Sequence, residues 1–208
     1  MHTLQKLSYI GKQPQTRRSQ LLSRVIESGF NCLAAHSLIR AANPYLSQLA
    51  NAGGETASLT EAVGLDMAYL VQLVISKFIP VNTPVGMCIP MYRTSSGRAW
   101  FSMQTDDTVR TIRVQSTRAA RTPATLTDVD AIFEPVAACR QVGYANNYGE
   151  LCLSDMGIAA PIRGSRGQPL GAVYLSPPAS RWTLEEAQKK LSSLVIECAQ
   201  VISRSIAH

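Results

Sequence analysis

Two runs of apolar residues toward the end of the chain predict a β-hairpin. Residues 156–162 and 170–176 are each of strand length, and the loop between them carries Gly164 and Gly167. Short apolar runs joined by a glycine-bearing loop are typical of paired antiparallel strands. Both runs are rich in glycine, alanine and serine, and such small side chains leave room beside a sheet for a closely packed helix or for a ligand.

A second pair of strand-like runs lies earlier in the chain. Residues 56–63 and 67–75 favour extended structure, and Gly-Leu-Asp at residues 64–66 is a turn signal between them.

Helical spacing predicts elements on both sides of these strands. The clearest one begins with a capping box, Thr183 and Glu186, and continues as an apolar stripe. The stripe consists of Ala187, Leu191, Leu194, Val195, Cys198, Ile202 and Ile206. We expect further helices over residues 16–28 (ended by Gly29), 43–53 (opened by Asn43 and Pro44), 94–101 and 128–142. Helices packed on a mostly antiparallel sheet make an α+β fold.

Composition agrees with a folded domain and adds one asymmetry. Of 208 residues, 46% are hydrophobic and 16% charged, which is typical of a globular chain. The formal net charge is +6, and residues 1–30 carry five lysines and arginines against the single acidic residue Glu27. A basic end before a nearly neutral body suits a DNA-contacting head on a sensing domain, and simple solubility explains the same charge.

Enzyme and metal chemistry find no support in the sequence. The five cysteines are scattered without a Cys-x-x-Cys pair, which argues against a disulfide framework and a zinc site. Two of the three histidines, His2 and His208, are near the termini, and no catalytic constellation surrounds His36. No apolar run has the length of a signal peptide or a membrane span. We therefore expect a cytoplasmic protein that is not an enzyme, needs no cofactor or metal and contacts no membrane.

Several segments together resemble the IclR family of bacterial transcriptional regulators. They are Gly-Glu-Thr-Ala-Ser-Leu at residues 54–59, Val-Gly-Met-Cys-Ile-Pro-Met-Tyr-Arg-Thr-Ser-Ser-Gly-Arg-Ala-Trp at 85–100, Arg-Gln-Val-Gly-Tyr-Ala at 140–145, Gly-Ile-Ala-Ala-Pro-Ile at 157–162 and Ser-Arg-Trp-Thr-Leu-Glu-Glu at 180–186. Their order and spacing carry the resemblance from about residue 43 to the C-terminus.

The resemblance implies a domain plan and a function. Residues 38–208 would form a GAF-like effector-binding domain with an antiparallel sheet flanked by helices. Residues 1–37 would hold a partial helix-turn-helix head and linker helix. Such regulators bind a small organic acid and operator DNA and form homodimers or homotetramers. The branch that this chain resembles includes regulators of aromatic-acid breakdown.

The resemblance also places an effector site. Carried over residue by residue, its lining would be Phe78, Val81, Ser95, Ser96, Asn147, Gly157, Tyr174 and Ser176. The turn from Thr94 to Gly97 offers hydroxyls and backbone N–H groups that could hold an anion, or Thr94 and Ser95 could simply cap the following helix. Tyr174 stands where relatives often have a smaller residue, so it either narrows the cavity or supplies a ring for stacking.

The N-terminus resembles the recognition helix of the head, over residues 12–30. Its exposed face would offer Arg17, Arg18, Ser19, Gln20 and Arg24 to DNA, with a solvated helix face as the alternative. The family has a two-stranded wing after this helix. Only residues 31–37 remain before the linker, and two strands with a turn need roughly a dozen residues. The sequence thus predicts either a regulator with a shortened head or an effector-binding module that has lost its DNA-binding head.

Overall fold

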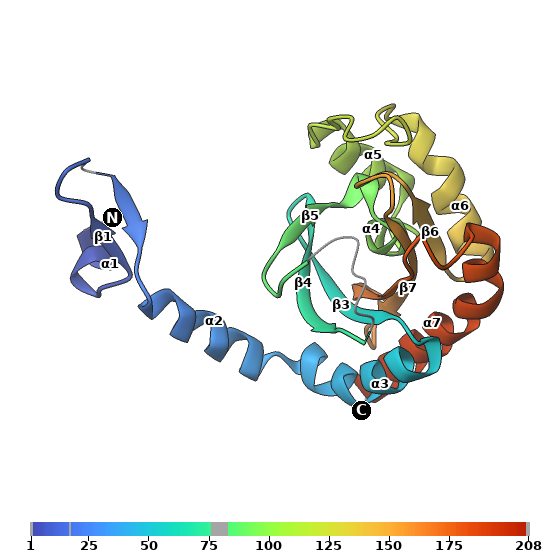
Figure 1. Ribbon diagram of the computed structural model, residues 1–208, viewed down its shortest axis with the longest axis horizontal. Helices are drawn as coiled ribbons and strands as arrows, with labels where there is room; N and C mark the ends of the chain where they lie inside the picture. Colours follow the sequence, from blue (N-terminus) through green and yellow to red (C-terminus); the bar gives the residue numbers. More distant parts are fainter. Residues whose placement is uncertain (1, 17, 76–82, 207–208) are drawn as a thin grey trace. The chain divides into compact units, whose positions relative to one another are not determined.

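The computed structural model describes residues 2–16, 18–75 and 83–206, which form two compact units over residues 1–40 and 41–208 (Figure 1). The predicted domain boundary, between residues 37 and 38, stays a prediction. A continuous helix, α3 (Ser37–Gly53), runs through both dividing points.

The N-terminal unit contains a β-hairpin where the sequence predicted a helix. Its elements are α1 (His2–Lys6), β1 (Ile10–Lys12), β2 (Ser19–Leu21) and α2 (Arg24–Ala35). The strands are antiparallel, with Ile10 opposite Leu21, and the backbone N–H of Leu22 donates to the carbonyl of Tyr9. The predicted helix over residues 16–28 is therefore wrong for residues 16–23, whereas residues 24–28 lie in α2. Apolar residues at 9–10 and 21–22 pair across a polar loop that contains Pro14, and Gly29 lies inside α2 in helical conformation.

This hairpin also overturns the argument that the chain has no room for a wing. Only residues 31–37 follow Phe30 before the linker, but the two paired strands lie before α2, within residues 10–21. A missing wing is no longer a reason to infer that the head is lost.

The second unit is built on a six-stranded antiparallel sheet. Its strands are β3 (Thr56–Val63), β4 (Asp66–Leu73), β5 (Cys88–Pro90), β6 (Ala145–Tyr148), β7 (Met156–Arg163) and β8 (Pro169–Ser176), in the order β5-β4-β3-β8-β7-β6. Both predicted hairpins are present, as β3–β4 and β7–β8. Pairing of β3 with β8 joins them into one sheet.

Helices cover both faces of this sheet, so the predicted α+β class is confirmed (Figure 1). A Cβ at Gly53, in α3, would lie 3.0 Å from Leu175 of β8 and 3.7 Å from Leu191 of α7 (Leu184–Ile206). The next residue back along β8, Tyr174, lies against Ser95 of α4 (Ser95–Phe101) around Gly157. Because successive strand residues point to opposite faces, α3 and α7 cover one face and α4 the other.

The remaining helices complete the second unit. They are η1 (Met91–Arg93), α5 (Asp106–Gln115), η2 (Asp130–Ile132) and α6 (Phe133–Val142). Gly143 ends α6 in the left-handed conformation, as predicted. The capping box of α7 is confirmed by the hydrogen bond from the backbone N–H of Glu186 to Thr183 Oγ1, at 3.2 Å. The helix expected from Asn43 begins six residues earlier, because Leu38, Ile39 and Ala42 are buried apolar residues that extend its inner face.

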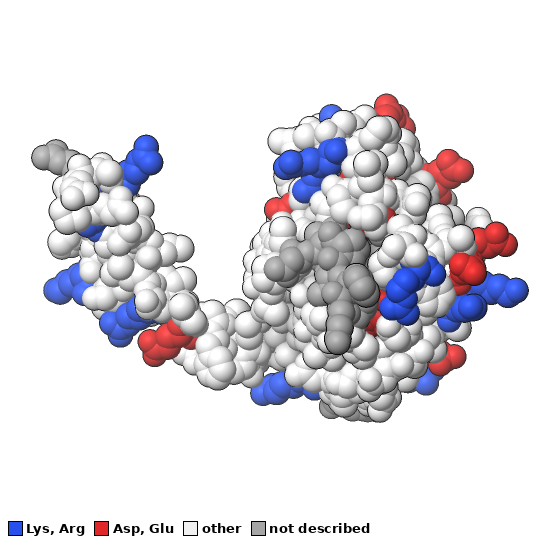
Figure 2. All heavy atoms as spheres, viewed as in Figure 1, with Lys and Arg blue, Asp and Glu red and all other residues white. Residues whose placement is uncertain are grey.

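None of the helices in the described ranges is both long enough and apolar enough to span a membrane. Figure 2 shows basic side chains along the N-terminal unit, whose one acidic residue in the sequence is Glu27.

Candidate functional site

The start of α4 sits tightly against η1 and is capped by its own chain. Thr94 Oγ1 accepts from the backbone N–H of Gly97 at 3.0 Å, so the capping interpretation is confirmed for Thr94. A Cβ at Gly97 would lie 2.2 Å from the carbonyl oxygen of Met91, which explains why glycine stands there. The backbone N–H of Ser95 donates to Asn147 Oδ1 at 3.1 Å. Two of the N–H groups that an anion would need therefore already have partners.

Four of the predicted effector residues converge at one point above the sheet. A Cβ on Gly157 would lie 2.5 Å from Ser95 Oγ, 2.5 Å from Tyr174 Cε2 and 2.6 Å from Asn147 Oδ1. We call Ser95, Asn147, Gly157 and Tyr174 the Gly157 cluster. Helix α4 supplies the first, and strands β6, β7 and β8 supply the other three.

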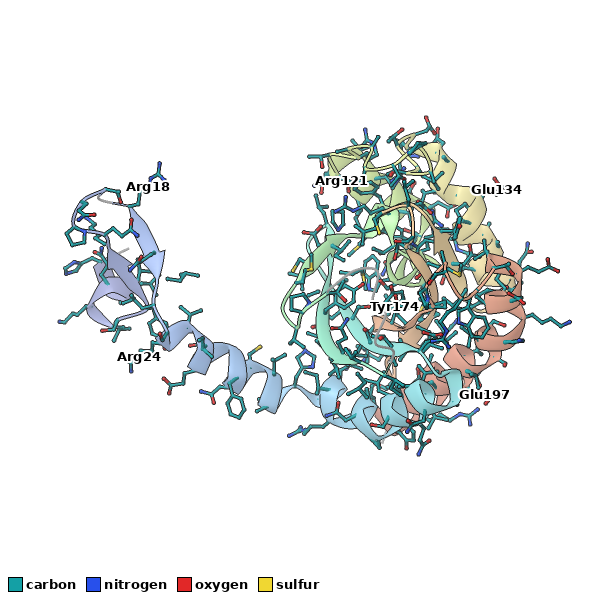
Figure 3. All side chains as sticks on the ribbon, in the orientation of Figure 1. Arg18, Arg24, Arg121, Glu134, Tyr174 and Glu197 are labelled. Carbon is teal, nitrogen blue, oxygen red and sulfur yellow. The ribbon has the colours of Figure 1, made fainter. Side chains whose placement is uncertain are left out.

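Tyr174 brings a buried aromatic ring to the Gly157 cluster, deep within the second unit (Figure 3). Its ring packs edge-on against Tyr69 of β4, with centroids 6.2 Å apart and an interplanar angle of 84°. This geometry is the favoured one for aromatic pairs. Burial, with the neighbouring Tyr69 and Asp155, raises the pKa of Tyr174 well above its usual value. The phenol therefore stays neutral and can donate a hydrogen bond.

A buried carboxyl group fixes the orientation of Asn147. Asn147 Nδ2 donates to Asp155 Oδ2 at 2.5 Å, which leaves Asn147 Oδ1 to accept from Ser95. Burial raises the pKa of Asp155 to about 6, against the lowering effect of the Asn147 hydrogen bond. Nearby, Arg98 and Glu150 form a buried ion pair at 2.6 Å. These buried polar groups thus hold Asn147, and with it one side of the Gly157 cluster, in a fixed orientation.

Three buried hydroxyl groups on this face have no hydrogen-bond partner within the described ranges. They belong to Ser95 of the cluster and to Thr56 and Ser58 of β3. Directly paired residues share a face of the sheet, and Ser58 lies opposite Tyr174 while Thr56 lies opposite Ser176. Buried hydroxyls without partners are costly in a protein, so they are natural contact points for a polar ligand.

The sequence analysis missed Thr56 and Ser58. The signal that could have identified them is the alternation of hydroxyl residues at positions 56, 58 and 60 in an otherwise apolar strand, because such a pattern places all three on one face. Thr60 differs from the other two in that its hydroxyl donates to the carbonyl of Ala172 at 3.3 Å.

The other four predicted effector residues are Ser176, Ser96, Phe78 and Val81. Ser176 ends β8 and hydrogen-bonds with the Tyr174 side chain, which lowers the pKa of Tyr174 against the larger effect of burial. Ser96 is buried in the first turn of α4, next to Ser95. Phe78 and Val81 lie outside the described residues.

The predicted DNA-contacting residues do not share a helix face. Ser19 and Gln20 are in β2, and the exposed Arg18 precedes them in the hairpin loop (Figure 3). Arg24 begins α2, where its guanidinium donates to the carbonyl of Leu7 at 2.9 Å and lies 5.6 Å from the Tyr9 ring. Arg24 therefore holds the hairpin to the helix. Arg17 falls outside the described residues.

Of the free cysteines, Cys139 and Cys198 are buried, whereas Cys32 and Cys88 are exposed. In the parts of the chain that the structure describes, no three His, Cys, Asp or Glu side chains lie close enough to hold a metal ion. Burial raises the pKa of the Cys198 thiol to about 12 and raises that of Cys139, so neither thiol is a nucleophile near neutral pH.

Comparison with known proteins places these features in a family. Residues 30–204 match the family described as the C-terminal domain of bacterial transcriptional regulator IclR. The chain is 29% identical over 209 residues to the Pca regulon regulatory protein of Pseudomonas putida, covering all of this chain and 70% of that one. It is 25% identical over 181 residues to the transcriptional repressor AllR of Escherichia coli, covering 85% of this chain and 66% of that one.

A solved structure supports the same fold. An IclR homologue from Microbacterium hydrocarbonoxydans, complexed with 4-hydroxybenzoate, superposes with a TM-score of 0.78 at 19% identity. The match covers 99% of this chain and 82% of that one.

Proposed function

We infer, from the fact that this chain belongs to the IclR family of bacterial transcriptional regulators, that its sheet domain binds a small organic acid which alters DNA binding. The observation that carries this proposal is the Gly157 cluster. It joins an aromatic ring, an amide oxygen and a buried serine hydroxyl without a partner in the described chain. A convergence of a few polar groups on a mostly apolar surface is the usual form of a small-molecule site.

Three features support an aromatic acid as the effector. The edge-on pair of Tyr69 and Tyr174 offers ring surfaces to a flat ligand. The hydroxyls of Ser95, Ser58 and Thr56 can donate to a carboxylate or accept from a ligand hydroxyl. One structural relative carries 4-hydroxybenzoate, a molecule with both groups.

We propose that the ligand acts by population shift. A protein with two arrangements moves toward the one that binds the ligand better, and the shift is limited by the difference in affinity. For this chain the two arrangements would be two ways of presenting paired N-terminal units to operator DNA. This step therefore requires a homodimer or homotetramer, as the family resemblance implies.

DNA contact would come from the β1–β2 hairpin. Lys12 and Arg18 are exposed, and neither forms an ion pair among the described residues. Exposed cations of this kind bind phosphate oxygens without reading sequence. We propose that these two side chains help to position the head on the duplex.

Thermal melting against a panel of acids tests the effector proposal. We expect 4-hydroxybenzoate and benzoate to raise the melting temperature and acetate to leave it unchanged. At a hundredfold excess over Kd, a ligand adds about 2.7 kcal/mol to the free energy of unfolding. Equal responses to all three acids, or none to any, would contradict an aromatic-acid site at the Gly157 cluster.

A further inference from the structure

A cavity lies in the second unit, between α6, β7 and α7. Its volume is about 400 Å³, within the range of small-molecule sites. Cys139, Ala160 and Ile196 contribute apolar atoms to its lining. We call it the α6–α7 groove.

The groove is separate from the Gly157 cluster. None of the four residues of that cluster is among the residues that line the groove, which come mainly from α6, β7 and α7. A ligand could occupy either one without filling the other.

The charged residues that line the groove are all cationic. They are Arg140, Arg163 and Arg204, and no aspartate or glutamate is among the lining residues. Arg140 is already compensated, because its guanidinium forms an ion pair with Asp106 at 2.8 Å and donates to the carbonyls of Ser102 and Gln104. Within the described ranges, Arg163 and Arg204 form no ion pair.

One side-chain contact joins Arg163 to the part of α7 that carries Arg204. The backbone N–H of Arg163 donates to Ser203 Oγ at 2.9 Å, and Ser203 Oγ donates to the carbonyl of Ala199 at 2.6 Å. Arg204 follows Ser203 directly in α7. The register of β7 against β8 shifts between Ile162 and Arg163, and such bulges redirect the side chain that follows. This hydrogen bond joins the end of β7 to the last turns of α7. Arg163 donates it from the strand, and Arg204 follows its acceptor, Ser203, in the helix.

The helix dipole accounts for the position of Arg204 but not for that of Arg163. Arg204 lies in the last turn of α7, where the helix dipole favours positive charge. Arg163 is at the end of a strand, which has no such dipole. Its charge beside an apolar floor is therefore available to a ligand.

We propose that the α6–α7 groove binds a small organic anion, whose carboxylate or phosphate group is held by Arg163 and Arg204 and whose apolar body lies on the groove floor. Two guanidinium groups suit either oxyanion, since each can form paired hydrogen bonds with it. The side-chain amide of Gln200, also in the lining, can bind a ligand hydroxyl or carbonyl.

Calorimetric titration of the full chain with benzoate and with phenyl phosphate tests this proposal. The double variant Arg163→Gln/Arg204→Gln removes both cations from the groove. Arg166→Gln/Lys189→Gln removes the same charge from exposed positions outside it. A third variant, Ser95→Ala, alters the Gly157 cluster and leaves the groove intact.

We expect at least one probe to bind the groove saturably, with affinity at least tenfold weaker in Arg163→Gln/Arg204→Gln and unchanged in Arg166→Gln/Lys189→Gln. Ser95→Ala should leave this groove binding unchanged and weaken only the separate binding of benzoate at the Gly157 cluster. Tighter binding of phenyl phosphate would identify a phosphate ligand, and tighter binding of benzoate a carboxylate. Equal losses in both charge variants would overturn the proposal, because they indicate non-specific attraction. Loss in Ser95→Ala alone would also overturn it and would support the effector proposal instead. Absence of saturable binding by either probe would overturn it as well.

Discussion

Gly157 is the residue on which the Gly157 cluster depends. Any side chain there would meet Ser95 Oγ and Tyr174 Cε2 at 2.5 Å, closer than real Cβ contacts allow. The family resemblance predicted this glycine and its three neighbours as effector-site residues, and the structure brings the four together. The resemblance did not identify Asp155, because the role of that carboxyl depends on a hydrogen bond to Asn147 that only the folded strands bring about.

Ser95→Ala separates ligand binding from stability at the cluster. Ser95 Oγ is buried and has no hydrogen-bond partner among the described residues, so its removal takes away an unsatisfied group. We expect the free energy of unfolding to stay within about 0.5 kcal/mol of the wild type, or to rise, while the thermal shift with 4-hydroxybenzoate falls. Differential scanning fluorimetry with and without ligand measures both. A less stable variant with an undiminished ligand shift would contradict this assignment.

Asp155 makes the stability of the second unit depend on pH. Its pKa is raised from 3.8 to about 6, first of all by burial, so the folded protein holds the proton more tightly than the unfolded chain. The resulting stabilisation is fully present below pH 4 and is lost as the pH rises through 6. A pKa shift of this size corresponds to a change of about 3 kcal/mol in the free energy of unfolding.

Asp155→Asn removes this titration and keeps an oxygen that can accept from Asn147. We expect urea unfolding between pH 4 and pH 7 to show a smaller fall in stability for the variant than for the wild type, by up to about 3 kcal/mol. Parallel curves for the two proteins would show that Asp155 does not titrate in this range.

At the scale of elements, the long strands could be predicted from the sequence and the short ones could not. The hairpins β3–β4 and β7–β8 have strands of eight residues, long enough for their character to be visible. The strands of β1–β2 have three residues each, too few to show a period of two, and Leu21, Leu22, Val25 and Ile26 imitate helical spacing instead. Tertiary pairing of Ile10 with Leu21 decided the outcome.

The capping box of α7 gives an element-scale prediction. Thr183 Oγ1 accepts from the backbone N–H of Glu186, and the Glu186 carboxylate accepts from the backbone N–H of Thr183 at 3.1 Å. We expect Thr183→Ala to reduce the free energy of unfolding by about 1 kcal/mol. Chemical denaturation measures the loss. Ser154→Ala, in an exposed loop, is the control and should change stability by less than about 0.5 kcal/mol.

The β1–β2 hairpin gives a prediction about DNA. If Arg18 binds a phosphate, Arg18→Ala weakens binding to all sequences alike and reduces the slope of log K against log salt by about one. Fluorescence anisotropy over a range of salt concentrations measures the slope. Arg181→Ala, in the second unit, is the control of equal charge. Identical slopes for the wild type and Arg18→Ala would remove this side chain from the interface.

At the scale of the whole molecule, the sequence indicated the family and the fold, and the effector site that it predicted stays a prediction. The alternation at positions 56, 58 and 60 could have placed Thr56 and Ser58 on one face, but only the register of β3 against β8, two strands more than a hundred residues apart, places them opposite Ser176 and Tyr174. The α6–α7 groove could not be predicted from the sequence either. Its arginines are scattered in sequence, at positions 140, 163 and 204, and only the hydrogen bond between β7 and α7 brings the last two together.

The measurement that tests the central claim most directly is calorimetric titration of 4-hydroxybenzoate into the wild type and into Gly157→Ala. The added methyl group would lie within 2.6 Å of three cluster atoms, which must shift to admit it. The variant should therefore be less stable than the wild type, and its folded form should bind at least tenfold more weakly. Gly29→Ala, at an open position in α2, is the matched control and should bind as the wild type does. Equal affinity in the wild type and a folded Gly157→Ala variant would show that the acid does not bind at the Gly157 cluster.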